Sequence, residues 1–174
     1  MKLIPSVDLE ERAEEIIEVT GSQGRVSEAI MKTNDLQYLR SGLRVKCEKD
    51  VNPSVRRTCL SFAVWLRTYM EFLIRVVVYL KTDYQHKTRD TRELASATFF
   101  APYDKTVEPY IRIATGDYEE LVSERGKNDA LWAILSSLAH ETIHYQQWLE
   151  DKEMDEKEAE NGSEELLDSY YRFL

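Results

Sequence analysis

The stretch LAHETIHYQQWLEDKEMDEKEAE, residues 138–160, contains the end of one predicted helix and the start of the next. The patterns of these two segments are the basis of the fold prediction. The first segment begins at Asn128 or Asp129, either of which can cap a helix, and it is apolar around most of its circumference, which is typical of a buried helix. The second segment, 153–171, predicts a helix whose inward stripe contains Leu166, Leu167, Tyr170 and Tyr171. The sequence therefore predicts two consecutive helices joined by a short acidic connection.

Upstream of these helices the pattern favours strands and one further helix. That helix is expected to begin at Pro53, because proline is favoured at the first helical position. A loop with one helical turn is expected before the long apolar helix. Alternating or β-branched runs predict strands over 43–48, 73–81, 95–102 and 108–115. We expect an α+β domain in which a small, mostly antiparallel sheet packs against the long helices.

The N-terminal part of the chain has a different pattern. Short helices are predicted over 8–19 and 25–32, separated by the helix-breaking sequence GSQG. We therefore expect a helical arm of unassigned role over 1–42, followed by one domain over 43–174.

Composition narrows the classes of partner and location. The chain has 174 residues, 32 acidic and 23 basic, with a net charge of −9, and no basic stripe runs along it. Phosphate binding needs clustered Lys and Arg, so we expect no nucleic-acid partner. No apolar run is long enough to span a bilayer, and no signal-peptide core is present at the N-terminus, so we expect a cytoplasmic protein without a membrane partner. The two cysteines, Cys47 and Cys59, are expected to be reduced core thiols.

The motif HETIH places two histidines four residues apart on the first of the two long helices. His140 and His144 therefore project from one face, one turn apart, where both imidazoles can bind one cation. Zinc accepts neutral imidazole nitrogen and in catalytic sites takes three protein ligands, which leaves a position for water. Glu141 lies beside His140 and can exchange a proton with that water. This pattern favours a zinc-dependent hydrolase, although a helix with two satisfied histidines and a non-catalytic metal site are both alternatives.

The third ligand is expected among the acids that follow the motif. The buried stripe of the second helix passes through Ala159, and Glu156 and Glu160 lie close to that stripe, whereas Glu158 turns away from it. Glu156 is the favoured ligand, with Glu160 as a hydrogen-bond acceptor that orients a ligand. Glu160 and Glu158 remain alternative ligands.

His140, Glu141 and His144, followed by EKEAE at 156–160, resemble the gluzincin pattern of zinc metallopeptidases, which is HExxH plus a glutamate on the next helix. The segment from residue 43 to the C-terminus is similar to the smallest members, the minigluzincins. This resemblance implies a zincin-like fold, one zinc ion, a peptide or protein substrate, and Glu141 as the group that polarises water. It also implies that the edge strand, 109–115, borders the cleft and holds an extended peptide by strand addition.

This chain also departs from the pattern and leaves some roles open. Only eleven residues separate His144 from Glu156, and Ile143 replaces the small residue usual before the second histidine. A group that stabilises the oxyanion is left unassigned among Tyr110, Arg112, Tyr145, Tyr170 and Tyr171. The alternative function is a non-catalytic binding or regulatory module stabilised by zinc. A second alternative is a regulatory protease for which residues 1–42 dock a partner or plug the cleft.

Overall fold

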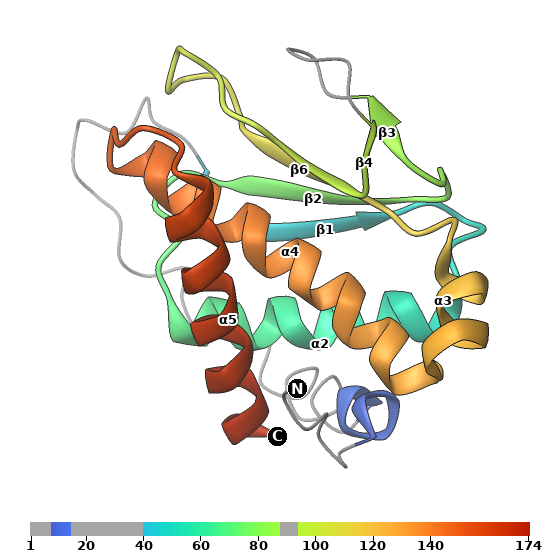
Figure 1. Cartoon of the computed structure of the whole chain (residues 1–174). Coiled ribbons are helices and arrows are strands. Elements are labelled where there is room, and N and C mark those ends of the chain that lie inside the picture. The colour runs from blue at the N-terminus through green and yellow to red at the C-terminus, as the bar shows by residue number, and fades with distance from the viewer. Residues whose placement is uncertain (1–7, 15–39, 88–93) are drawn as a thin grey trace.

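The computed structural model describes residues 8–14, 40–87 and 94–174. Its centre is a four-stranded sheet in the order β1-β2-β6-β5, with the helices gathered beneath one face (Figure 1). A separate two-stranded ladder pairs β3 (His86–Lys87) with β4 (Leu94–Ala95). The four strands of the main sheet are β1 (Leu43–Cys47), β2 (Val76–Lys81), β5 (Ala97–Phe100) and β6 (Tyr110–Ala114). Among the described residues, none of the helices combines the length and the apolar character that crossing a membrane requires.

The domain is α+β, as predicted, but the expectation of a mostly antiparallel sheet is wrong. The pairs β1–β2 and β2–β6 are parallel, and only β5–β6 is antiparallel. The helix α2 (Pro53–Tyr69) carries the chain back between β1 and β2, so both strands run in the same direction. Residues 101–109 form a hairpin connection from β5 to β6, and these two strands run in opposite directions. The sheet is mixed, with its one antiparallel strand at an edge.

Helix α2 covers the face of the sheet on which the core lies. The side chain of Asn52 caps it by accepting a hydrogen bond from the backbone N–H of Ser54 at 2.9 Å, and Pro53 occupies the first turn as predicted. Its buried side chains recur every three or four residues and face β1 and α4. They include Val55, Cys59, Phe62 and Leu66.

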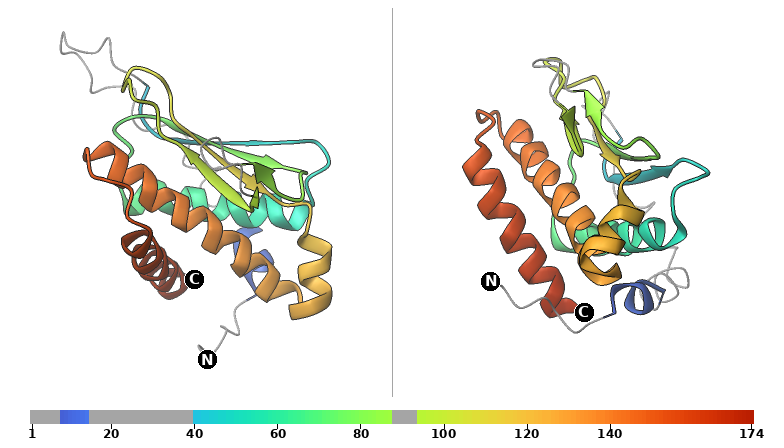
Figure 2. Two further views of the ribbon diagram at one scale, coloured as in Figure 1. Left: turned by 45° about the horizontal axis from the view of Figure 1, so that its top comes forward. Right: turned by 45° about the vertical axis from the view of Figure 1, so that its right-hand side comes forward.

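Helix α4 (Lys127–Leu149) is the central element of the helical layer. It packs against α2, α3 (Tyr118–Arg125), α5 (Glu156–Phe173) and the strands β5 and β6. Because neighbours surround it on most sides, its apolar residues are not confined to one stripe, and this accounts for the predicted burial. The two views of Figure 2 show α5 lying along the outer side of α4, away from the sheet. The predicted helical turn before α4 is the two-turn helix α3.

The described part of the N-terminal segment packs onto the domain. Residues 9–14 are helical, and Leu9 and Ala13 are both buried, with Leu9 inside the main hydrophobic core. This helix lies beside the first turns of α2 and α4, since Glu10 pairs with Arg57 and Lys127. The rest of the predicted helix 8–19 and the helix 25–32 lie outside the described residues. The division of the chain at residue 42 stays a prediction.

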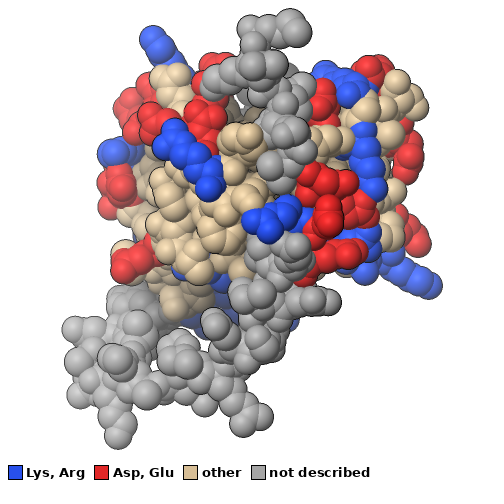
Figure 3. All heavy atoms as spheres, turned by 90° about the horizontal axis from the view of Figure 1, so that it is seen from below, with Lys and Arg blue, Asp and Glu red and all other residues tan. Residues whose placement is uncertain are grey.

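Glu10 makes the stability of the protein depend on pH. Its hydrogen bond with Lys127, and those with Ser54 and Arg57, outweigh burial and lower its pKa to about 2. Acidic and basic side chains lie side by side on the underside of the molecule (Figure 3). A carboxyl whose pKa is lower in the folded state stabilises that state above its ordinary pKa of 4.5, and this contribution is lost as the pH falls toward 2.

We therefore expect Glu10→Gln to lower the free energy of unfolding by about 1 kcal/mol at pH 7. The difference from the wild type should shrink steadily below pH 4.5 in thermal unfolding scans. Glu11→Gln is the matched control, because Glu11 is an exposed neighbour on the same helix, and it should change little at any pH. A Glu10→Gln difference that stays constant down to pH 2.5 would contradict the assignment.

Candidate metal centre

The two histidines of the HETIH motif project from one side of α4. His140 Nε2 and His144 Nε2 both point toward the first turn of α5, and the ring centroids are 4.8 Å apart. The side chain of His144 is 8% exposed, whereas that of His140 is 28% exposed. One histidine is therefore set into the protein, and the other borders solvent.

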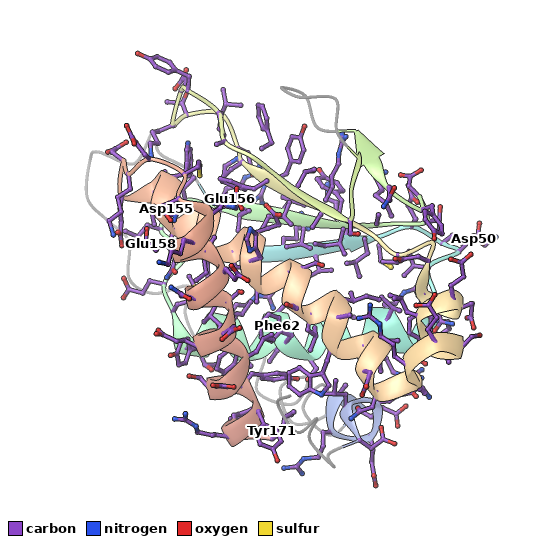
Figure 4. The ribbon with its side chains drawn as sticks, in the orientation of Figure 1. Asp50, Phe62, Asp155, Glu156, Glu158 and Tyr171 are labelled. Carbon is purple, nitrogen blue, oxygen red and sulfur yellow. The ribbon has the colours of Figure 1, made fainter. Side chains whose placement is uncertain are left out.

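Glu156 reaches both histidines from the first residue of α5. Its Oε2 lies 3.1 Å from His140 Nε2, and its Oε1 lies 3.3 Å from His144 Nε2. The residue before it, Asp155, caps α5 by accepting a hydrogen bond from the backbone N–H of Glu158 at 2.7 Å. Figure 4 shows Asp155, Glu156 and Glu158 together at the end of α5 that lies beside α4. The cap thus fixes the helical turn from which Glu156 extends.

The donor set and its spacing fit a zinc ion. The ligand atoms of His140, His144 and Glu156 all lie within 4.8 Å of one another. Bonds of about 2.0–2.2 Å in a tetrahedral zinc site place neighbouring ligand atoms about 3.3–3.5 Å apart, so the two histidine–carboxylate distances are within a few tenths of an ångström of that value. Two imidazole nitrogens and one carboxylate oxygen are the ligands of a catalytic zinc site. The Glu156 side chain is 78% exposed, so solvent can reach the position that a fourth ligand of the zinc ion would occupy.

The other two acids considered as ligands lie elsewhere. Glu158 is two residues from Glu156, about 200° around the helix, and accepts a hydrogen bond from Gln147 instead. Glu160 is exposed, and its carboxylate makes no hydrogen bond or ion pair within the described residues. The prediction that Glu160 orients a ligand is therefore wrong for this structure.

Gln147 is the residue of the site that the sequence analysis missed. Its side chain accepts from His144 Nδ1 at 2.8 Å and donates to the carbonyl of Asp155 at 3.0 Å and to Glu158 Oε2 at 2.9 Å. It is 2% exposed. The available signal was a polar residue three positions after His144 on an otherwise buried face, which places it one turn along on the same side of α4.

Glu141 is a buried carboxyl group beside the histidine pair. It is 8% exposed, and within the described part of the chain its carboxylate has no hydrogen-bond partner. Burial, followed by the nearby Glu156 carboxylate, raises its pKa to about 7. An unpaired carboxyl group with this pKa can both accept and release a proton near neutral pH, which is the property of a general base.

The strand beside the site is β5 rather than the predicted strand 109–115. β6 lies between β2 and β5, so the expectation that it forms the edge of the sheet is wrong. Along the chain β5 precedes β6. β6 pairs with β2 on one side and with β5 on the other, which leaves β5 at the edge of the sheet. Phe99 on β5 contacts the rings of Tyr145 and Trp148, which follow His144 on α4. The outer edge of β5 has no strand partner within the described residues.

None of the five residues considered for stabilising an oxyanion contacts the cluster. The hydroxyl of Tyr145 donates a hydrogen bond to the carbonyl of Ile74, and the hydroxyl of Tyr170 is hydrogen-bonded to that of Ser61 at 2.8 Å. Tyr110 and Arg112 alternate with the buried Ile111 and Ile113, so they face away from α4. Tyr171 lies at the opposite end of α5 from Glu156 (Figure 4). That role stays unassigned.

A groove lies on the other side of α5 from Glu156. Its volume is about 610 Å³, and its walls come from α4, α5 and the end of α2. Glu158 and Gly162 line it, whereas His140, His144 and Glu141 do not. The groove is thus separate from the histidine cluster, and the open side of the cluster faces solvent directly.

Comparison with known proteins adds no relative to this description. The chain matches no protein-family model, no curated protein and no solved structure. Its site therefore has to be interpreted from its own residues and geometry.

Proposed function

We propose that this protein is a zinc-dependent metallopeptidase of gluzincin type, with a zincin-like fold. The observation that carries the proposal is the combination of a three-ligand cluster, open to solvent on one side, with a nearby buried carboxyl group that has no hydrogen-bond partner among the described residues. His140, His144 and Glu156 would hold one zinc ion, and Glu141 would act on water. A bound zinc ion would supply positive charge that acidifies water and polarises a peptide carbonyl.

The chain's own groups divide the remaining work. Glu141 takes a proton from the attacking water and delivers it to the leaving nitrogen, and its pKa near 7 suits both transfers. The side chain of Glu141 is buried, which limits its exchange of protons with bulk water. Within the described residues the outer edge of β5 has no strand partner, so it can offer backbone N–H and C=O groups to an extended peptide, which supports a peptide substrate.

The primary test is the zinc content of the purified protein and its variants. We expect about one zinc per wild-type chain by elemental analysis, and a loss of at least about 100-fold in zinc affinity for Glu156→Ala, because one of three ligands is removed. Glu160→Ala is the matched control, since it removes an exposed carboxylate from the same helix. A wild type that stays metal-free after incubation with zinc, or equal losses in both variants, would overturn the proposal.

Zinc binding without hydrolysis would favour the non-catalytic alternative. In that case the ion would fasten α5 to α4, and metal removal would lower stability without affecting any reaction. Incubation of the zinc-loaded wild type with a library of varied peptides, followed by mass spectrometry, separates the two functions.

A further inference from the structure

The buried amide of Gln147 connects one of the histidines to the first turn of α5. Its three hydrogen bonds use both ends of the amide, toward His144 on one side and toward Asp155 and Glu158 on the other. Its backbone carbonyl also accepts a hydrogen bond from the N–H of Lys152 at 2.9 Å. Gln147 therefore holds both the histidine and the connection between the two helices.

The partners of this amide fix its orientation. The Asp155 carbonyl and the Glu158 carboxylate can only accept hydrogen bonds, so the NH₂ group of Gln147 must face them. Its carbonyl oxygen consequently faces His144, where it can only accept. His144 Nδ1 must then carry the proton, and in the neutral ring the lone pair lies on Nε2, the nitrogen that points toward Glu156.

The same amide also controls the position of Glu156. The side chain of Glu156 is 78% exposed, so few neighbours pack against it. The position of its carboxylate therefore depends on where the backbone of the first turn of α5 lies. Asp155 and Glu158, the two residues that Gln147 binds, lie on either side of Glu156 in the sequence. Because the Asp155 side chain also caps the backbone of Glu158, the whole first turn of α5 is held as one unit.

We propose that Gln147 is a positioning residue that presents two of the three metal ligands in the geometry zinc requires. It selects the His144 tautomer that leaves Nε2 unprotonated, and it docks the turn that carries Glu156. The proposal rests on the proposed function, because it assumes that the cluster binds zinc. Hydrogen-bond partners of this kind typically contribute 10–100-fold to metal affinity.

The test compares zinc affinities measured by competition with a chromogenic chelator. We expect Gln147→Leu, which keeps the buried volume but makes no hydrogen bonds, to weaken zinc binding about 10–100-fold. Gln146→Leu is the matched control, because Gln146 is the adjacent glutamine and, among the described residues, its side chain hydrogen-bonds only to the sulfur of Met70, at 3.9 Å, and to none of the groups around the cluster. It should change the affinity less than about 3-fold, within the usual scatter of a surface substitution of about 0.5 kcal/mol.

A second pair of variants keeps the test decisive where Gln147→Leu fails to fold. Gln147→Glu still accepts a hydrogen bond from His144 Nδ1, but it cannot donate and it places a carboxylate against Glu158. We expect about 10-fold weaker zinc binding. Combining it with Glu158→Gln restores a donor opposite the new carboxylate and should recover most of the lost affinity, which a loss of packing alone would not do.

Each outcome bears on a different claim. If the wild type binds zinc and Glu156→Ala does not, but Gln147→Leu binds as tightly as the wild type, the positioning role is wrong and the metal site stands. Failure of the double variant to recover affinity would also overturn the role. If the wild type binds no zinc, the proposed function and this inference fail together.

Discussion

Replacing Glu141 with glutamine should leave a folded, zinc-binding protein whose peptide hydrolysis falls by about 10²–10⁴-fold. Glutamine has nearly the same shape as glutamate, but its amide cannot accept a proton from water. Glu141 is not within the cluster of three ligands, so zinc content should stay near that of the wild type. Activity is measured as kcat/KM on a peptide that the wild type cleaves, with the metal content of each sample determined in parallel.

The control for this change is Glu160→Gln, which removes a carboxylate from the exposed side of α5. It should retain activity within about 3-fold of the wild type, as surface substitutions usually do. Retention of most of the activity by Glu141→Gln would show that another group transfers the proton. A joint loss of zinc and activity would instead make Glu141 part of the metal site.

Of the substitutions proposed for this protein, Trp148→Ala should cause the largest loss of stability, about 3–5 kcal/mol in the free energy of unfolding. Trp148 is 7% exposed and packs against Phe99 and Tyr145. Its indole N–H donates to the carbonyl of Pro102 at 2.8 Å, and Lys105 lies over its ring at 4.1 Å. The residue thus fastens the β5–β6 turn to the end of α4 that carries the histidines.

The milder variant Trp148→Phe separates packing from the hydrogen bond. It keeps an aromatic ring in the core but leaves the Pro102 carbonyl without its donor, so we expect a loss of about 1–2 kcal/mol from that bond and the smaller ring. Urea unfolding gives both values. Amide hydrogen exchange over 99–110 should accelerate in the alanine variant, because the turn loses its anchor. A loss below about 1.5 kcal/mol for Trp148→Ala would contradict this account of the packing.

The elements that the sequence predicted well are those with local causes. The start of α2 follows from the preferences of Asn52 and Pro53, and the continuous apolar pattern over 128–149 predicted that α4 is buried. The proximity of His140 and His144 needs nothing beyond helical geometry, because residues four apart lie on one face. Helical periodicity likewise separated Glu156 from Glu158, and the structure places only Glu156 beside both histidines.

The errors concern contacts between distant parts of the chain. Strand patterns report burial and alternation, which are the same for parallel and antiparallel neighbours, so the direction of β1 and β2 depends on how α2 crosses between them. The edge position of β5 depends in the same way on which side of β6 it joins. Neither relation is encoded within a single segment.

The sequence by itself determined the helices α2, α4 and α5, the spacing of the histidine pair, and the helix face on which Glu156 lies, because each depends on repeats of a few residues. The tertiary structure decided the mixed sheet, the burial of Glu141, and the choice of Gln147 over Glu160 as the partner of a histidine. These features arise where α4 meets α5 and the sheet. Burial and hydrogen bonding there are set by side chains brought together only when the chain folds.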